Sequence, residues 1–347
     1  GGGAGPLAAM ALSQSFQRRV PLGDGTQMAV HDFGGLGPPL ILLHGTGLHG
    51  LVFTPMARSL RSRFRCLAPD LRGHGDSAAA AAVLSFDAAT AVQDVVRLIE
   101  HLELDRCMVF GHSHGGMLAL YLAETCQRVE AVYCFDPIVS SPETYSSLAR
   151  IGVGLAQRAS REARDGQQPH RTLCRGQPAS QLLRSPVGCR RRRQFASAAE
   201  AARELGRKFP YSDFTDEALQ LFVAHAFRLS PDGEGVVLKC DPDIEAFIYV
   251  DIGKHARSIW QGISAIRCRV VVSCAGHAQA PHDALQRAAA ELAEELRQRS
   301  HGECSFHRHE GLHHFGPFTA PARIAEHVES MLLPTDLSTS REMRSRL

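Results

Sequence analysis

The sequence predicts an α/β protein built on a doubly wound, mostly parallel sheet with a helical cap inserted into it. Apolar runs of strand length alternate with segments whose apolar residues recur at helical spacing. Loops rich in glycine, histidine and aspartate follow several of the strands, as is typical of the carboxyl edge of a parallel sheet. Between residues 138 and 255 this alternation stops and the readable pattern is helical. The interruption predicts a cap or lid over the sheet edge.

The composition is that of an ordinary globular protein. Of the 347 residues, 44% are hydrophobic and 21% are charged, and a net charge of +2 gives no general case for binding nucleic acid or an anionic membrane. The longest apolar runs suit buried strands and are far shorter than a membrane span. The ten cysteines include no C-x-x-C pair, and several lie in strand-like runs, so we expect reduced thiols and a cytoplasmic location.

The first half of the predicted core covers residues 15–137 and follows a leader, residues 1–14, that we expect to be disordered. A Gly-Asp-Gly turn at residues 23–25 predicts a β-hairpin. The near-continuous apolar run Pro38–Leu43 predicts a strand that is buried on both faces. The other predicted elements of this half are strands at residues 15–22, 26–33, 64–68, 107–110 and 129–135, and helices at residues 54–62, 86–102 and 117–123.

The predicted cap covers residues 138–255 and is followed by the second half of the core, residues 256–333. A basic, irregular segment in the cap, residues 165–193, is interpreted as a solvated loop, with an anion-attracting rim over the site as the alternative. Its run Arg190–Arg193 lacks interleaved aromatic residues and matches no recognised module, so no nucleic-acid binding is predicted. The remaining predicted elements are cap helices at 142–163, 197–208 and 216–228, an extended cap segment at 236–240, core strands at 268–274 and 304–309, core helices at 282–299 and 321–333, a loop at 311–317 and a polar tail at 334–347.

One serine stands between two glycines at the point where a predicted strand turns into a predicted helix. The residues Gly-His-Ser-His-Gly-Gly, at positions 111–116, follow an apolar run and precede a helical pattern. In so tight a turn, glycines let neighbouring backbone approach, and the serine hydroxyl is held at a helix N-terminus, where amide groups favour developing negative charge. We therefore predict that Ser113 is the nucleophile of a nucleophile elbow.

Four motifs, in this order along the chain, resemble the α/β-hydrolase fold family. They are HGTG at residues 44–47, DLRGHGDS at residues 70–77, GHSHGG at residues 111–116 and LHHFGP at residues 312–317. The resemblance spans about residues 15–333 and implies a base in the loop after the last strand, with the acid between nucleophile and base. It also implies an oxyanion hole made by the backbone N–H groups of Thr46 and His114.

Two adjacent histidines compete for the role of base. The family's usual ending, a histidine directly before an aromatic residue, matches His314, so we assign His314 as the base and keep His313 as the alternative. His307 and His309 lie nearby in the sequence. These four histidines have neither a carboxylate partner nor a helical i, i+4 pair, so no metal site is predicted.

The acid departs from the family pattern. Much of the family has an aspartate a few residues after the glycine that ends the next-to-last strand, whereas this chain has Gln279 there. We favour Asp136, at the end of the strand that follows the elbow helix, because some lipases of this fold use that position. Asp283 is the alternative, although the start of a predicted helix suits it for capping or dipole stabilisation. The sequence also leaves open the absence of any acid.

These assignments predict a serine hydrolase that cleaves a carboxylic ester, thioester or lactone of a small to medium apolar substrate through an acyl-serine intermediate. The alternative is a catalytically weak or inactive binding or scaffold protein, because losing the orienting carboxylate costs about 10⁴ in turnover. No cofactor is predicted, since the chain has no P-loop and no G-x-G-x-x-G after a strand. The expected partner is the small-molecule substrate, without nucleic acid or integral membrane association.

Overall fold

The computed structural model describes residues 15–77, 85–144, 192–277 and 282–333. Predictions for the leader, the tail, most of the helix at 142–163 and most of the basic segment at 165–193 lie outside the described residues. Among the helices of the described ranges, none has both the length and the apolar character needed to cross a membrane.

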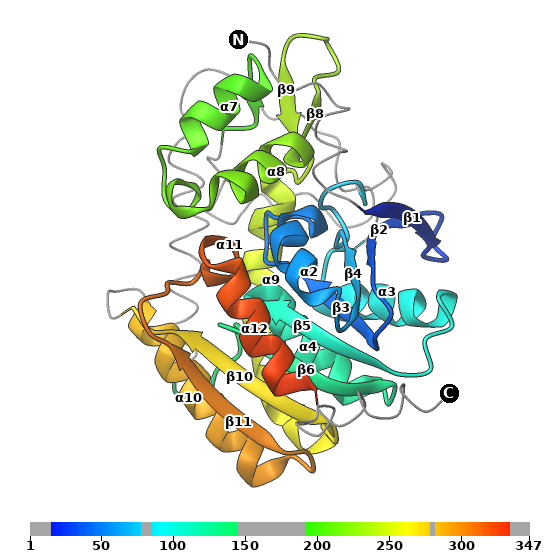
Figure 1. Cartoon of the computed structure of the whole chain (residues 1–347), viewed down its shortest axis with the longest axis vertical. Helices are drawn as coiled ribbons and strands as arrows, with labels where there is room; N and C mark the ends of the chain where they lie inside the picture. Colours follow the sequence, from blue (N-terminus) through cyan, green and yellow to red (C-terminus); the bar gives the residue numbers. More distant parts are fainter. Residues whose placement is uncertain (1–14, 78–84, 145–191, 278–281, 334–347) are drawn as a thin grey trace, which may run out of the picture.

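An eight-stranded sheet forms the centre of the fold (Figure 1). Its spatial order is β1-β2-β4-β3-β5-β6-β10-β11. The β1–β2 hairpin and the β2–β4 pair are antiparallel, and all other neighbours are parallel. This is the doubly wound, mostly parallel sheet that the sequence predicts. Its strands are β1 (Phe16–Pro21), β2 (Gln27–Gly34), β3 (Pro39–Leu43), β4 (Arg65–Pro69), β5 (Cys107–His112), β6 (Val129–Phe135), β10 (Arg269–Ala275) and β11 (Cys304–His309).

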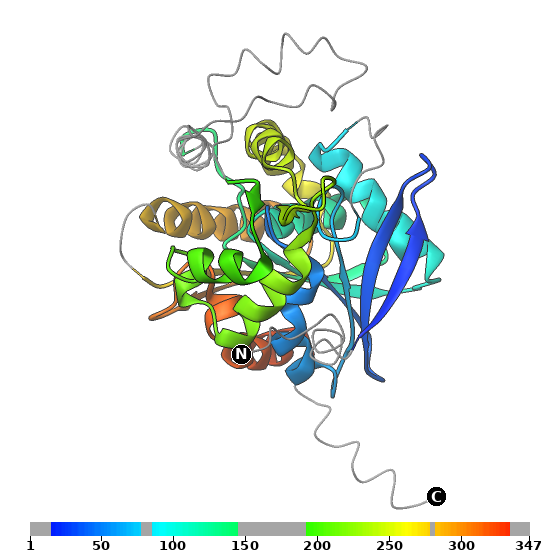
Figure 2. The same ribbon diagram turned by 90° about the horizontal axis from the view of Figure 1, so that it is seen from above.

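Side chains of the central strands alternate between two hydrophobic cores, one on each face of the sheet. Ile41 and Leu43 of β3 belong to one core, whereas Leu40 and Leu42 belong to the other. Because both faces are covered, the strands read as continuous apolar runs in the sequence. Figure 2 shows the two helical layers on opposite sides of the sheet. The first core holds α3 (Ala88–His101), α4 (His114–Thr125), α9 (Pro242–Gly262) and α10 (His282–Arg299), and the second holds α2 (Thr54–Leu60) and α12 (Pro321–Leu332).

The inserted segment contains strands as well as helices. Its helices α7 (Ala198–Leu205) and α8 (Asp216–Ala226) match two of the predictions, but the last residues of the helix expected at 216–228 form the strand β8 (Phe227–Leu229). β8 pairs with β9 (Val236–Leu238), which also pairs with β7 (Gln194–Phe195), so a separate three-stranded sheet is formed. The helix prediction is wrong there because tertiary pairing with β9 overrides the local pattern of a strand only three residues long.

Helix α8 attaches this segment to the core. It packs against α2 and against the short helix η1 (Gly50–Phe53). Just before α8, the N–H of Thr215 donates to the carbonyl of Phe318 at 3.1 Å, in the short helix α11 (Gly316–Thr319). Figure 1 accordingly draws the inserted segment above α11 and α2.

Helix α9, which the hydrophobic pattern did not reveal, joins the inserted segment to the core. It starts at Asp241, whose carboxylate accepts the N–H of Asp243 at 2.8 Å, with Pro242 in the first helical position. The helix then runs without a break to Gly262 and packs against α3 and α4. The expected boundary between cap and core, at residue 255, falls inside this helix.

Candidate active site

Ser113 lies between β5 and α4, where the sequence places the elbow. Its φ of 57° and ψ of −117° cost about 1–3 kcal/mol for a residue with a side chain. Two hydrogen bonds hold this turn: the N–H of Ser113 donates to the carbonyl of Phe135 at 2.9 Å, and its own carbonyl accepts the N–H of Met117 at 3.1 Å. Strand β6 and the first turn of α4 therefore fix the serine backbone from two sides.

The elbow glycines are required by close backbone approach. A Cβ on Gly111 would lie 2.3 Å from the carbonyl oxygen of Gly115, and a Cβ on Gly115 would lie 2.1 Å from the carbonyl oxygen of Leu43 in β3. Both distances are far below a carbon–oxygen contact, so only glycine fits at either position. The two glycines thus let the first turn of α4 press against β3 and β5.

The loop after β3, which carries Thr46, lies against the serine. A Cβ on Gly45 would lie 3.3 Å from the Cβ of Ser113. Among the described residues, the N–H groups of Thr46 and His114 donate to no backbone carbonyl. The two amides predicted to form the oxyanion hole are therefore free to donate to a developing oxyanion.

His74 braces this loop, a contact that the sequence alone did not reveal. Its Nε2 accepts the N–H of Gly47 at 3.0 Å, and its Nδ1–H donates to the carbonyl of Arg72 at 3.0 Å. The side chain is fully buried, and burial lowers the pKa of His74, which keeps the ring in the neutral form that this pattern needs. A second hydrogen bond joins the loop after β3 to the segment after β4, because Nε2 of His44 accepts the N–H of Leu71 at 3.0 Å.

Asp136 directly follows β6, and its side chain is only 1% exposed. Its backbone N–H donates to the carbonyl of Ser273 at 2.8 Å, and its Oδ1 accepts the N–H of Ala275 at 3.0 Å, both in β10. Its second oxygen, Oδ2, lies 3.0 Å from Nδ1 of His314. Strand β10 therefore engages one carboxylate oxygen and leaves the other facing the imidazole.

The two adjacent histidines face different carboxylates. His314, after β11, faces Asp136, whereas Nε2 of His313 lies 3.2 Å from Oδ2 of Asp213 in the inserted segment. Nδ1 of His313 also accepts the N–H of Phe315 at 3.1 Å, so both nitrogens of this ring have partners. The structure thus brings the favoured base to the favoured acid and directs the alternative base elsewhere.

The alternative acid, Asp283, is the second residue of α10, in the first-turn position that the sequence indicates. Its side chain and the whole of Gln279 lie outside the described part of the structure. In the described part, the carboxylate beside His314 is that of Asp136.

A separate cluster of histidines lies between the strands β6 and β11 and the helix α12. The hydroxyl of Tyr133 is 2.9 Å from Nε2 of His309 and 2.8 Å from Nδ1 of His327, and the ring of His307 lies 4.6 Å from that of His327. Within the described ranges, no group of three or more histidine, cysteine, aspartate or glutamate side chains has the arrangement of a metal site. The cluster is a hydrogen-bonded part of the packing between β6, β11 and α12.

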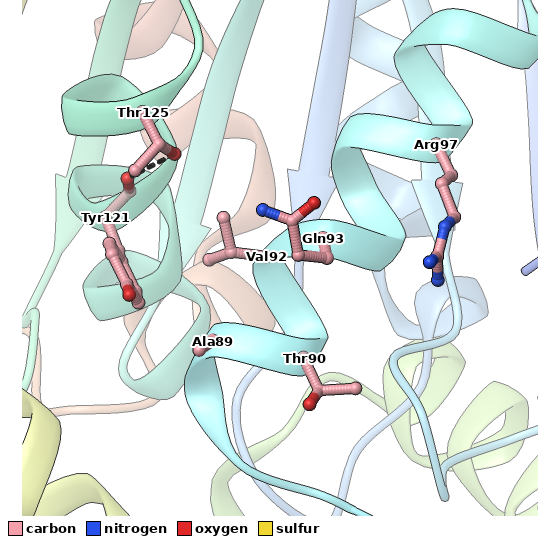
Figure 3. Close-up of a pocket in the computed structure, with 7 residues that line it drawn as sticks. All are labelled: Ala89, Thr90, Val92, Gln93, Arg97, Tyr121 and Thr125. Atoms are coloured by element: carbon pink, nitrogen blue, oxygen red, sulfur yellow. Dashed lines mark hydrogen bonds between the residues drawn. The ribbon is translucent and has the colours of Figure 1, made fainter.

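A cavity of about 290 Å³ opens between α3 and α4 (Figure 3). Tyr121 and Thr125 in its wall stand two or more turns along α4 from Ser113, roughly 12 Å or more at the rise of an α-helix. None of the predicted site residues lines this cavity, so we do not assign it to the same site. Its lining residues are Ala89, Thr90, Val92, Gln93, Arg97, Tyr121 and Thr125.

Comparisons with known proteins agree with the fold. Residues 38–184 match the family model described as the alpha/beta hydrolase fold. The crystal structure of E-2-(acetamidomethylene)succinate hydrolase superposes with a TM-score of 0.66 over 92% of this chain and 99% of that one, at 18% sequence identity. The parallel sheet, with Ser113 at the turn between β5 and α4, is the doubly wound architecture that the sequence predicts. The chain therefore has the α/β-hydrolase fold.

Two curated relatives match over shorter stretches. The magnesium-chelatase 30 kDa subunit of Rhodobacter capsulatus is 42% identical over 87 residues, which are 25% of this chain and 30% of the relative. The soluble epoxide hydrolase of Corynebacterium sp. (strain C12) is 38% identical over 105 residues, which are 30% of this chain and 36% of the relative. The match therefore spans about a third of the length of each of these relatives.

Proposed function

We propose that this protein is a serine hydrolase that cleaves a carboxylic ester, thioester or lactone of a small to medium apolar substrate. The observation that carries the proposal is the 3.0 Å contact between Nδ1 of His314 and Oδ2 of Asp136, next to a serine in elbow geometry. The ring of His112, the residue before Ser113, lies 4.9 Å from the ring of His314, so the base loop reaches the elbow. Nucleophile, base and acid would then be Ser113, His314 and Asp136.

In the proposed mechanism, the proton on Nδ1 of His314 is held by Asp136, which leaves the lone pair on Nε2 as the base. The hydroxyl oxygen of Ser113 attacks the substrate carbonyl carbon while its proton passes to Nε2 of His314. The amides of Thr46 and His114 stabilise the oxyanion. His314 then protonates the leaving alcohol or thiol, an acyl-serine remains, and water activated by the same imidazole releases the acid.

The chemistry of a serine nucleophile favours carbonyl substrates over epoxides, although an epoxide hydrolase is among the relatives. Attack of the Ser113 hydroxyl on a carbonyl gives an ester that water can cleave. Attack on an epoxide carbon would give an ether, which water does not cleave under mild conditions, so turnover would stop after one event. An acyl group is therefore the transferred group that permits repeated turnover from Ser113.

The inserted segment and the location of the protein belong to the same proposal. We assign residues 138–255 as a cap that limits access to Ser113, since α8 packs on η1 and α2 beside the base loop. His313 from that loop pairs with Asp213 of the inserted segment, so the cap contributes a contact next to the base. A cytoplasmic location suits the cysteines of the described ranges, which are all in the free thiol form.

The test is hydrolysis of a series of p-nitrophenyl esters, thioesters and lactones, combined with fluorophosphonate labelling followed by peptide mapping. We expect the wild type to turn over the shorter esters and to carry the label on Ser113. Ser113→Ala is expected to lose both properties, whereas the matched control Ser230→Ala, a change at a buried serine of the inserted segment, should keep both. A wild type that matches Ser113→Ala in both assays would contradict the proposal and favour the binding or scaffold alternative.

A further inference from the structure

His112, the last residue of β5, contacts the base loop as well as the elbow. Its Nε2 lies 2.8 Å from the backbone carbonyl oxygen of His314, which is 202 positions further along the chain. The two rings lie 4.9 Å apart, and the His112 side chain is only 1% exposed. One buried ring thus touches both the backbone and the side chain of the proposed base.

The partners of His112 define its protonation state. A carbonyl can only accept, so Nε2 of His112 carries the hydrogen and Nδ1 carries a lone pair. Burial, and next the neighbouring His314, hold the pKa of His112 well below its ordinary value. The ring is therefore a neutral donor over the whole working range of a hydrolase, and it places no positive charge beside the base.

The same ring also fills the space between the base loop and the oxyanion loop. It meets Phe318 edge to face at 5.1 Å and lies 5.7 Å from the ring of Phe315. On its other side, a Cβ on Gly45 would lie 3.0 Å from Nδ1 of His112, so the loop before Thr46 rests directly on the imidazole. A change in this ring therefore alters the contacts of two loops, the base loop and the loop that carries Thr46. Both loops must keep their positions relative to Ser113.

We propose that His112 is a positioning residue, which holds the loop of His314 at a fixed distance from the elbow through its Nε2–H. This inference rests on the proposed function for its catalytic consequence. The base loop has other contacts: the carbonyl of Leu312 accepts the N–H of His277, after β10, at 3.0 Å, His313 pairs with Asp213 of the inserted segment, and His314 faces Asp136 after β6. None of these contacts reaches β5, whereas the bond from His112 joins the backbone of the base directly to the strand that precedes the nucleophile.

The test compares two substitutions of similar volume. His112→Gln keeps an N–H donor that can reach the carbonyl of His314, and His112→Met removes the donor while keeping the bulk. Tyr133→Phe is the matched control, because it removes an equally buried hydrogen-bonding group whose side-chain partners, His309 and His327, lie outside residues 311–317. Amide hydrogen exchange of the peptide covering residues 311–317 is measured together with kcat, KM and thermal unfolding.

We expect His112→Met to speed exchange in that peptide about fivefold, the effect of one net hydrogen bond. We also expect kcat to fall by up to about 10²-fold with KM unchanged. The reason is that the imidazole of His314 would move away from the position in which it accepts the proton of Ser113. His112→Gln should restore both values toward those of the wild type, and Tyr133→Phe should leave both unchanged.

Wild-type exchange in His112→Met, or equal exchange in the glutamine and methionine variants, would overturn the inference. The exchange measurement decides this point whether or not the protein hydrolyses esters. A wild type without hydrolase activity would therefore count against the proposed function, while the exchange of residues 311–317 would still test the positioning role of His112.

Discussion

Replacing Asp136 with asparagine is expected to switch the tautomer of His314 while the fold stays intact. Oδ1 of Asp136 accepts the N–H of Ala275, so an asparagine must place its amide oxygen at that site. Its NH₂ group would then face Nδ1 of His314 across the present 3.0 Å contact and donate to it. The imidazole proton would move to Nε2, the nitrogen that has to accept the proton of Ser113.

The size of the effect follows from this exchange of donor and acceptor. In a serine protease the equivalent aspartate-to-asparagine change lowers kcat by about 10⁴ through the wrong tautomer. That factor corresponds to about 5.4 kcal/mol of lost transition-state stabilisation. The free energy of unfolding should change by no more than about 1 kcal/mol, because the side-chain shape and the bond to Ala275 are kept.

The assay is steady-state hydrolysis of a short-chain p-nitrophenyl ester by the wild type, Asp136→Asn and Asp283→Asn, with thermal unfolding of all three. Asp283→Asn serves as the control, since it makes the same chemical change at the start of α10. We expect it to keep wild-type turnover. If Asp136→Asn stays within about tenfold of the wild type, equal to only 1.4 kcal/mol, the orienting role of Asp136 is refuted. Loss in Asp283→Asn alone would assign the acid to Asp283.

Two further predictions concern stability. Gly115→Ala should prevent the elbow from forming, because its Cβ would lie 2.1 Å from the Leu43 carbonyl oxygen, whereas Gly116→Ala meets its nearest atom only at 3.1 Å and should be much milder. Thermal unfolding of the two variants measures this difference, and equal losses would contradict it. Acid should destabilise the wild type, because burial lowers the folded pKa of His49 to about 3 while the unfolded chain binds the proton near its ordinary value of 6.5. Stability is therefore lost as the pH falls from about 6.5 towards about 3, by up to about 1.4 kcal/mol per pH unit for one proton. His49→Phe keeps a ring to stack on Phe222 and should flatten this slope in urea unfolding between about pH 7 and about pH 4.5. A slope equal to that of the wild type would mean that other groups carry the acid sensitivity.

The parallel sheet could be predicted from the sequence because its strands are apolar on both faces. β11 and α10 begin and end at the predicted residues, Cys304–His309 and His282–Arg299. The three-residue strand Phe227–Leu229 could not be predicted, because its conformation depends on pairing with Val236–Leu238 rather than on local pattern. Helix α9 escaped prediction although Asp241 and Pro242 form a readable start signal.

Less of the candidate site could be predicted, because adjacent residues on a loop can face opposite ways. Local pattern does not determine which of His313 and His314 turns toward β6, since the direction depends on how the loop leaves β11, and His314 is favoured only through the family's usual ending before an aromatic residue. The carboxylate of Asp136 meets its partner 178 positions away, and the brace from His74 to Gly47 also joins distant segments. Such contacts arise from tertiary structure, so the motifs identify the chemical groups but not their pairing. The assignment of the triad itself stays a prediction for the assays above.

The placement of Ser113 and Asp136 on one β5-α4-β6 unit has a consequence for how such chains can diverge. Adjacent parallel strands fix the distance between these two side chains, so the polypeptide from residue 137 to the start of β10 has no part in setting it. The part of that stretch before α9 can change in length or be exchanged, provided that α9 still packs on α3 and α4 and that β10 returns beside β6 to offer the carbonyl of Ser273 and the N–H of Ala275. The molecule is therefore suited to grafting, in which a foreign insertion before α9 brings a new chamber to an unaltered Ser113 and Asp136.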